Sequence, residues 1–96
     1  MTKSQTLAIL YKFQADTNAT RAALLDNDPS SARIAMTTLS EDLAALQTTA
    51  VNPELLAGIQ PRLDTALQYL ETEPRMAIDA LDTLSENLNV IATSLQ

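Results

Sequence analysis

Apolar residues recur every three or four positions along most of the chain, which is the period of an amphipathic α-helix. Alternating β-branched runs, which are typical of strands, do not occur in the sequence. Proline follows a residue that suits a helix N-cap in three segments, where Asp28, Asn52 and Thr72 are the expected caps. The pattern therefore predicts an all-α protein with four helices, near residues 4–26, 29–48, 53–71 and 74–95.

The last three predicted helices each carry one apolar stripe, which we expect to form the core. The stripe members are Ala32, Ala35, Met36, Leu39, Leu43 and Leu46 in the second helix, Leu56, Ile59, Leu63, Ala66, Leu67 and Leu70 in the third, and Ala77, Ala80, Leu81, Leu84, Leu88, Ile91 and Leu95 in the fourth. Pro61 interrupts the backbone hydrogen bonding of the third helix, but the stripe keeps its phase across it. We expect a kink at Pro61, with a short helix before Pro61 and a separate one after it as the alternative.

The chain matches itself at an offset of 45 residues. From Asp28 and Glu73 onward the match has no gap, and TLSEDL at residues 38–43 returns as TLSENL at residues 83–88. Upstream of these residues the match fades. Two copies are too few for a solenoid, and short connections favour antiparallel neighbours. The sequence predicts two related αα-hairpins, at about 4–48 and 53–95, in one antiparallel four-helix bundle-like domain that spans residues 1–96.

Composition narrows the function classes. The 96 residues include no Cys, no His and one Gly, so the chain offers no thiolate or imidazole and no glycine-rich phosphate loop. We therefore expect a non-enzymatic protein with no catalytic, cofactor-binding or metal-binding residues. A carboxylate hydrolase is the weaker alternative, since it would need a cleft that brings acids from different helices together.

Net charge bears on the partners. Twelve acidic and six scattered basic residues give a net charge of −6, which disfavours nucleic acids and anionic membranes. No run approaches the roughly 20 apolar residues of a membrane span, and Lys12 interrupts the apolar segment near the N-terminus. We expect a cytoplasmic protein whose partner is another protein or a second copy of the chain.

The first predicted helix is apolar on two sides. We assign one side, with Leu7, Tyr11, Ala15, Ala22 and Leu25, to the core. The other side is then a candidate contact face for a protein partner or a homodimer, and its members are Ile9, Phe13, Thr17, Thr20 and Leu24. On this interpretation the protein is a small adaptor, chaperone or inhibitor. The alternative is that the first helix is simply the most central helix of the monomer.

Acidic residues give a second functional interpretation. Residues 49–96 carry a net charge of −5 and residues 1–48 a net charge of −1. Asp79, Asp82 and Glu86 form one ridge on the fourth predicted helix, opposite its apolar stripe. A solvated outer face explains this ridge better than a divalent cation site. As an alternative function, the acidic second hairpin could neutralise a basic enzyme, as an immunity protein, antitoxin or inhibitor does.

Overall fold

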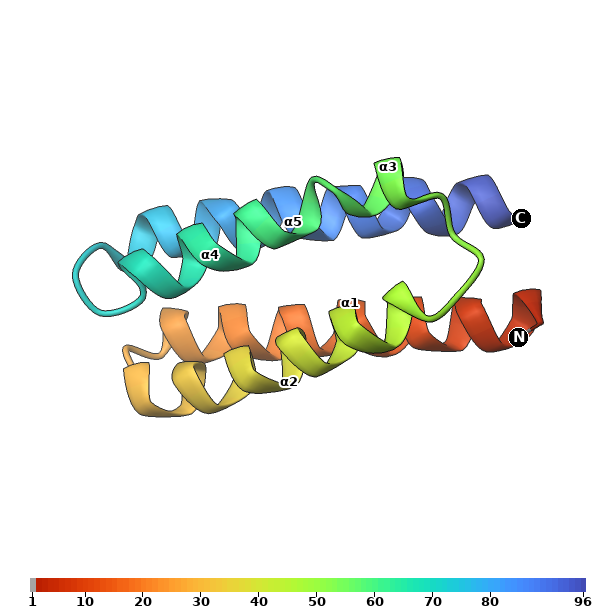
Figure 1. Cartoon of the computed structure of the whole chain (residues 1–96). Coiled ribbons are helices and arrows are strands. Elements are labelled where there is room, and N and C mark those ends of the chain that lie inside the picture. Colours follow the sequence, from red (N-terminus) through yellow and green to blue (C-terminus); the bar gives the residue numbers. More distant parts are fainter. Residues whose placement is uncertain (1) are drawn as a thin grey trace.

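The structure is a computed structural model that describes residues 2–96, and every regular element among these residues is a helix (Figure 1). The elements are α1 (Lys3–Leu25), α2 (Pro29–Gln47), α3 (Pro53–Leu56), α4 (Ile59–Tyr69) and α5 (Pro74–Leu95). The all-α prediction is confirmed. The helix starts predicted at Pro29, Pro53 and Pro74 are confirmed as well.

Helix N-caps explain where the elements begin. The Asp28 carboxylate accepts hydrogen bonds from the backbone amide of Ser31 at 3.1 Å and from its hydroxyl at 2.7 Å. The side chain of Asn52 accepts from the amide of Glu54 at 2.9 Å. The prediction of Thr72 as the third cap is wrong, because the N-cap of α5 is Glu73, whose side chain makes no capping hydrogen bond. Proline occupies the first helical position there, so the residue directly before it must be the cap.

The third predicted helix is broken rather than kinked. It ends at Leu56, and α4 begins at Ile59 after Ala57 and Gly58. The prediction of a kink at Pro61 is therefore wrong, and the alternative of two helices is closer. Pro61 lies in the first turn of α4 and not between the two helices. Its missing N–H is harmless there, because the first turn of a helix has no intrahelical acceptors for its amides.

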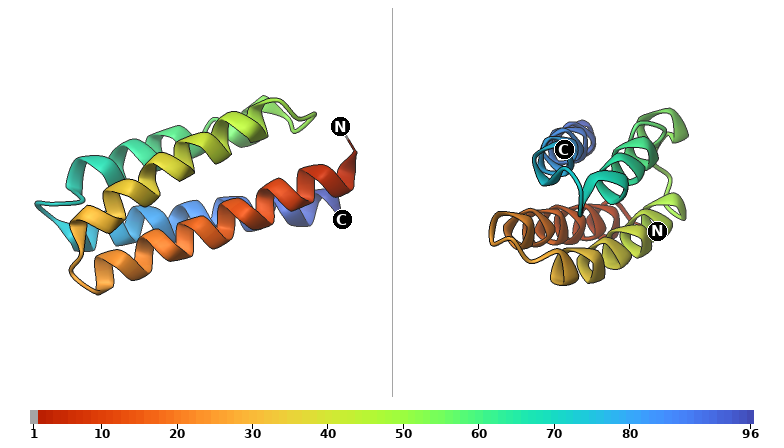
Figure 2. Two further views of the ribbon diagram at one scale, coloured as in Figure 1. Left: turned by 90° about the horizontal axis from the view of Figure 1, so that it is seen from below. Right: turned by 90° about the vertical axis from the view of Figure 1, so that its left-hand side faces the viewer.

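The four long helices pack as two antiparallel hairpins side by side (Figures 1 and 2). The first hairpin is formed by α1 and α2, and the second by α3, α4 and α5. Further contacts of α1 with α5, and of α2 with α4, close the bundle, and each neighbour runs antiparallel to the next. The molecule measures 38 × 20 × 19 Å, and both chain ends lie at the same end of it (Figure 1).

Core positions follow the predicted stripes in the last three helical segments, with one clear exception. Leu67 is 48% exposed and does not belong to the core, while Ala35 and Leu95 are half-buried. The prediction for the first helix is wrong, because the side that was expected to form the core is mostly exposed. Of its expected core residues only Leu7 is half-buried, and the exposed ones are Tyr11, Ala15, Ala22 and Leu25.

The internal repeat extends to the buried positions, at two different offsets. Buried positions of α2 and α5 are 45 residues apart, as in Leu39 and Leu84. Buried positions of α1 and of the α3–α4 segment are instead 46 residues apart. These pairs are Leu10/Leu56, Phe13/Ile59, Thr17/Leu63, Thr20/Ala66 and Leu24/Leu70. The turn of the first hairpin contains one extra residue, Asn27 in the left-handed conformation with φ 57°, and this shift is why the upstream match fades.

Candidate functional site

The predicted contact face of the first helix lies inside the bundle. The exposed fractions are 0% for Phe13, 1% for Thr17, 0% for Thr20 and 6% for Leu24, and Ile9 is half-buried. The prediction that these residues form an exposed face is therefore wrong. α1 packs against both α2 and α5, which cover this side of the helix, while the side that carries Tyr11 and Leu25 is exposed.

Hydrogen bonds to the preceding turn explain why threonine is tolerated in this core. The hydroxyl of Thr17 donates to the carbonyl oxygen of Phe13 at 2.8 Å, and that of Thr20 donates to the carbonyl oxygen of Asp16 at 2.8 Å. Each hydroxyl is thus satisfied within α1, which leaves the methyl group to pack as a valine methyl would. Threonine in the apolar phase of this helix is consequently a core residue.

The acidic residues predicted on the last helix remain exposed on α5, but they do not converge. Asp79 lines a hollow between α4 and α5 together with Arg62. Asp82 and Glu86 face the other way, toward α1, where the Asp82 carboxylate is 2.7 Å from Nε of Arg21. Among residues 2–96 no three His, Cys, Asp or Glu residues are grouped as a metal ion would require.

A polar groove of about 560 Å³ runs between α1 and α5. We call it the α1/α5 groove, and its lining residues are Gln14, Asn18, Asp82, Ser85, Glu86 and Asn89. Two carboxylates, three amides and one hydroxyl thus form this surface. Carboxylates accept hydrogen bonds only, whereas amides and hydroxyls both donate and accept, so the lining suits a cationic, hydrogen-bonding ligand.

A second groove, of about 280 Å³, lies between α2 and α4. Met36, Leu63 and Leu67 contribute its apolar part, and Leu67 is the most exposed of the three. Polar side chains border it, among them Arg33, which pairs with Glu71 in the turn after α4. This groove is an apolar strip with a polar border.

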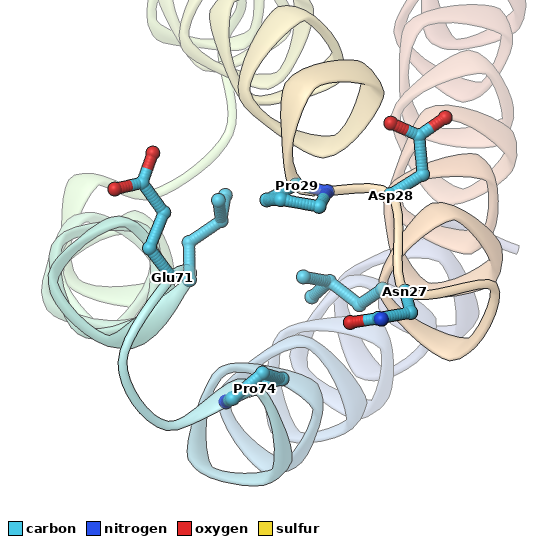
Figure 3. A pocket seen from close by; sticks show the side chains of 7 residues that line it. Asn27, Asp28, Pro29, Glu71 and Pro74 are labelled. Carbon is cyan, nitrogen blue, oxygen red and sulfur yellow. The ribbon is translucent and has the colours of Figure 1, made fainter.

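A small cavity of about 30 Å³ lies where the two hairpin turns meet (Figure 3). Pro29 of the first turn and Pro74 of the second both line it, together with Leu24 and Leu70. That volume holds about one water molecule and is far below the several hundred Å³ of an organic ligand site. The cavity is therefore a packing gap between the turns.

Three charged side chains that were not predicted as a site meet between α1 and α2. Nζ of Lys12 lies 2.7 Å from Oδ2 of Asp16 and 2.9 Å from Oδ1 of Asp42. Asp42 is only 4% exposed, and its other oxygen, Oδ2, has no hydrogen-bond partner among the described residues. The sequence does contain an indication that Asp42 is buried. Asp42 lies three residues after Leu39 and four before Leu46, so it belongs to the apolar face of α2.

The environment of this cluster moves the pKa of each member. Burial, followed by the neighbouring Asp16 carboxyl group, raises the pKa of Asp42 from 3.8 to about 6, although Lys12 opposes the shift. The neighbouring Asp42 carboxyl group, followed by the hydrogen bond from Lys12, lowers the pKa of Asp16. Hydrogen bonds to Asp16 and then to Asp42 raise the pKa of Lys12. The two carboxyl groups therefore differ sharply in their affinity for a proton.

Comparison of the chain with protein-family models, with curated proteins and with solved structures gives no match. Within residues 2–96, no helix combines the length and the apolar character needed to cross a membrane. The functional proposal therefore depends on the chain's own charges, grooves and buried groups.

Proposed function

We propose that this chain is a non-enzymatic protein-binding module that binds a basic protein partner through the α1/α5 groove. The observation that carries the proposal is the concentration of hydrogen-bonding side chains in this groove, where Asp82 and Glu86 lie side by side on α5. The net charge of −5 in residues 49–96 supports it, because an acidic surface steers a basic partner toward contact.

The ion pair at the edge of the groove indicates what such a partner would present. Asp82 already binds a guanidinium group, that of Arg21, and the side chains of the pair are 49% and 41% exposed. An exposed pair of this kind contributes little net stability, so a guanidinium from a partner can replace it at small cost. Arginine is the expected contact residue, because its planar group matches a carboxylate with two hydrogen bonds.

This proposal retains the alternative of an inhibitor that binds a basic protein. It replaces the predicted contact face of the first helix with the α1/α5 groove. Phe13, Thr17, Thr20 and Leu24 are enclosed by α2 and α5, so a partner or a second copy would have to bind elsewhere. A homodimer remains a testable alternative. Light scattering of the purified protein separates a monomer from a dimer directly.

An NMR titration with a short arginine–glycine peptide tests the proposed function. We expect the amide signals of the α1/α5 groove to shift, and the binding to weaken as salt is added. The double variant Asp82→Asn/Glu86→Gln should bind about tenfold more weakly, which corresponds to the loss of about 1.4 kcal/mol. The control Glu41→Gln/Glu54→Gln removes the same two charges from exposed positions on α2 and α3.

Equal weakening in both double variants would contradict the proposal, because it would mean that the peptide responds to net charge alone. Shifts spread evenly over all acidic residues, with none concentrated at Gln14, Asn18 and Asn89, would have the same meaning.

A further inference from the structure

The Lys12 cluster contains an unbalanced charge in a place where charge is costly. Two carboxylates and one ammonium sum to −1 when all three groups are ionised. Asp42 bears the cost, since it is 4% exposed whereas the Lys12 side chain is 61% exposed. Uptake of one proton by the carboxyl pair makes the cluster neutral, which removes the cost of a buried net charge.

The hydrogen bonding of Asp42 is also incomplete in its ionised form. Oδ1 accepts from Lys12, but Oδ2 is buried without a partner. A buried acceptor without a donor costs free energy, because water satisfied it in the unfolded chain. A protonated carboxyl group instead has an O–H that can donate to a neighbouring carboxylate, and Asp16, which binds the same Lys12 ammonium, supplies one nearby.

We propose that Asp42 and Asp16 form a proton-binding carboxyl pair, clamped by Lys12, that makes the packing of α1 against α2 tighten as the solution becomes mildly acidic. The charged groups that act on Asp42 are Lys12 and Asp16, both on α1. On α2 itself the adjacent Glu41 is exposed. The device therefore lies wholly within the first hairpin and is independent of the α1/α5 groove.

The sign of the effect follows from the pKa shifts. The pKa of Asp42 is raised to about 6 in the folded chain, so the folded state binds this proton more tightly than the unfolded state does. The resulting stability is present at low pH and is lost as the pH rises through about 6. Asp16 acts oppositely, but only below its ordinary pKa of 3.8, and Lys12 only above 10.5. Between pH 5 and 7.5 the shift at Asp42 dominates within the cluster.

Carbon-13 NMR of the side-chain carboxyl groups tests the proposal in the unaltered protein. We expect Asp42 to titrate with a midpoint near 6, well above the ordinary aspartate pKa of 3.8. A midpoint for Asp42 at or below this ordinary value would overturn the proposal. This measurement needs no variant, so it does not depend on whether a substituted chain folds.

Two variants give shifts of opposite sign and separate a proton-binding pair from a merely buried acid. Asp16→Asn removes the neighbour that raises the pKa of Asp42, so the midpoint of Asp42 should fall. Lys12→Met removes the neighbour that lowers it, so the midpoint should rise. An unchanged midpoint in both variants would show that burial alone sets it and that the pair does not exist.

Denaturant unfolding at pH 5.0 and 7.5 measures the effect on packing. The shift from 3.8 to about 6 predicts that the folded state gains about tenfold in its equilibrium over the unfolded state at the lower pH. Asp42→Asn should lose this tenfold gain. Asn87, which is half-buried at the position 45 residues later, indicates that an amide suits this site.

Glu41→Gln is the matched control for Asp42→Asn, because it removes one negative charge from the preceding residue, which is exposed. It should keep the tenfold gain on top of any general effect of net charge. If the two variants gave the same dependence of stability on pH, the proposal would be wrong.

Discussion

The two hairpins bury equivalent positions and fill them with different side chains. The central core positions of α1 hold Phe13, Thr17 and Thr20, whereas the positions 46 residues later hold Ile59, Leu63 and Ala66. On the second helices, Asp42 of the first hairpin stands where the second hairpin has Asn87. The first hairpin is thus more polar inside, and the second carries most of the net negative charge outside. The two hairpins therefore bury corresponding positions, while the side chains at those positions differ in polarity.

The hairpins also differ in the continuity of their first helices. α1 runs for 23 residues without interruption, while the corresponding part of the second hairpin is divided into α3, of 4 residues, and α4, of 11. Gly58 lies at the division, in a conformation with φ −80° and ψ −11° that any residue can adopt. Substitutions at Phe13, at Asp28 and Glu73, and at Gly58 test these differences between the two hairpins.

Phe13→Ala should have the largest effect on stability. Phe13 is fully buried at the centre of α1, and truncation of such a side chain leaves a cavity, so the free energy of unfolding should fall by about 3–5 kcal/mol. Tyr11→Ala is the control on the opposite side of α1, where the side chain is 49% exposed, and it should cost less than about 1 kcal/mol. Similar losses in the two variants, measured by urea denaturation, would mean that α1 does not present Phe13 to the core.

The helix caps give a prediction with opposite signs in the two hairpins. Glu73→Asp should place at the start of α5 the capping carboxylate that Asp28 provides for α2, and it should raise the free energy of unfolding by about 0.5–1 kcal/mol. Asp28→Ala should lower it, because the amide of Ser31 loses its acceptor. Thermal unfolding monitored by circular dichroism measures both changes. A loss of stability in Glu73→Asp would contradict the claim that α5 lacks a side-chain cap.

Gly58→Ala should have the smallest effect, a gain of about 0.4–1 kcal/mol. A Cβ at this position would meet Nδ2 of Asn87 at 3.6 Å, which is ordinary van der Waals contact, and the backbone conformation suits alanine. The gain comes from the smaller conformational entropy of the unfolded chain. Chemical denaturation of the variant beside the parent protein checks it, and destabilisation would indicate that the junction of α3 and α4 needs the freedom of glycine.

Helix boundaries and three of the four core stripes could be predicted from the sequence, because proline after a capping residue marks a helix start and leucine at helical spacing marks a buried face. Asp28 and Asn52 both cap as expected. The break before α4 could not be placed in the same way. Pro61 predicts an irregularity in this segment, but not where the helix breaks. Its position in the first turn of α4 depends on the bend of the chain at Gly58.

The buried side of the first helix could not be identified from residue type alone, because leucine occurs on both of its sides. Phe13 and Thr17, which the sequence predicts on an external face, are buried, and the Thr17 hydroxyl is satisfied within the helix. The signal that decides between the faces is the offset of 46 residues, which aligns Phe13 with Ile59, but the match at 45 residues hides it. The Lys12 cluster needed the pairing of α1 with α2, which brings Asp42 beside a residue 30 positions earlier.

An even number of antiparallel helices brings the two termini of a chain to the same end of the bundle. Both termini of this molecule lie at one end, which we call the terminal pole (Figure 1). A tag, label or surface tether attached at either terminus therefore leaves the molecule in the same direction. The opposite pole, formed by the two proline turns, stays unobstructed, as do the long flanks between the poles. A copy of the protein that is immobilised through either terminus would therefore keep the sides of the bundle accessible to a ligand in solution.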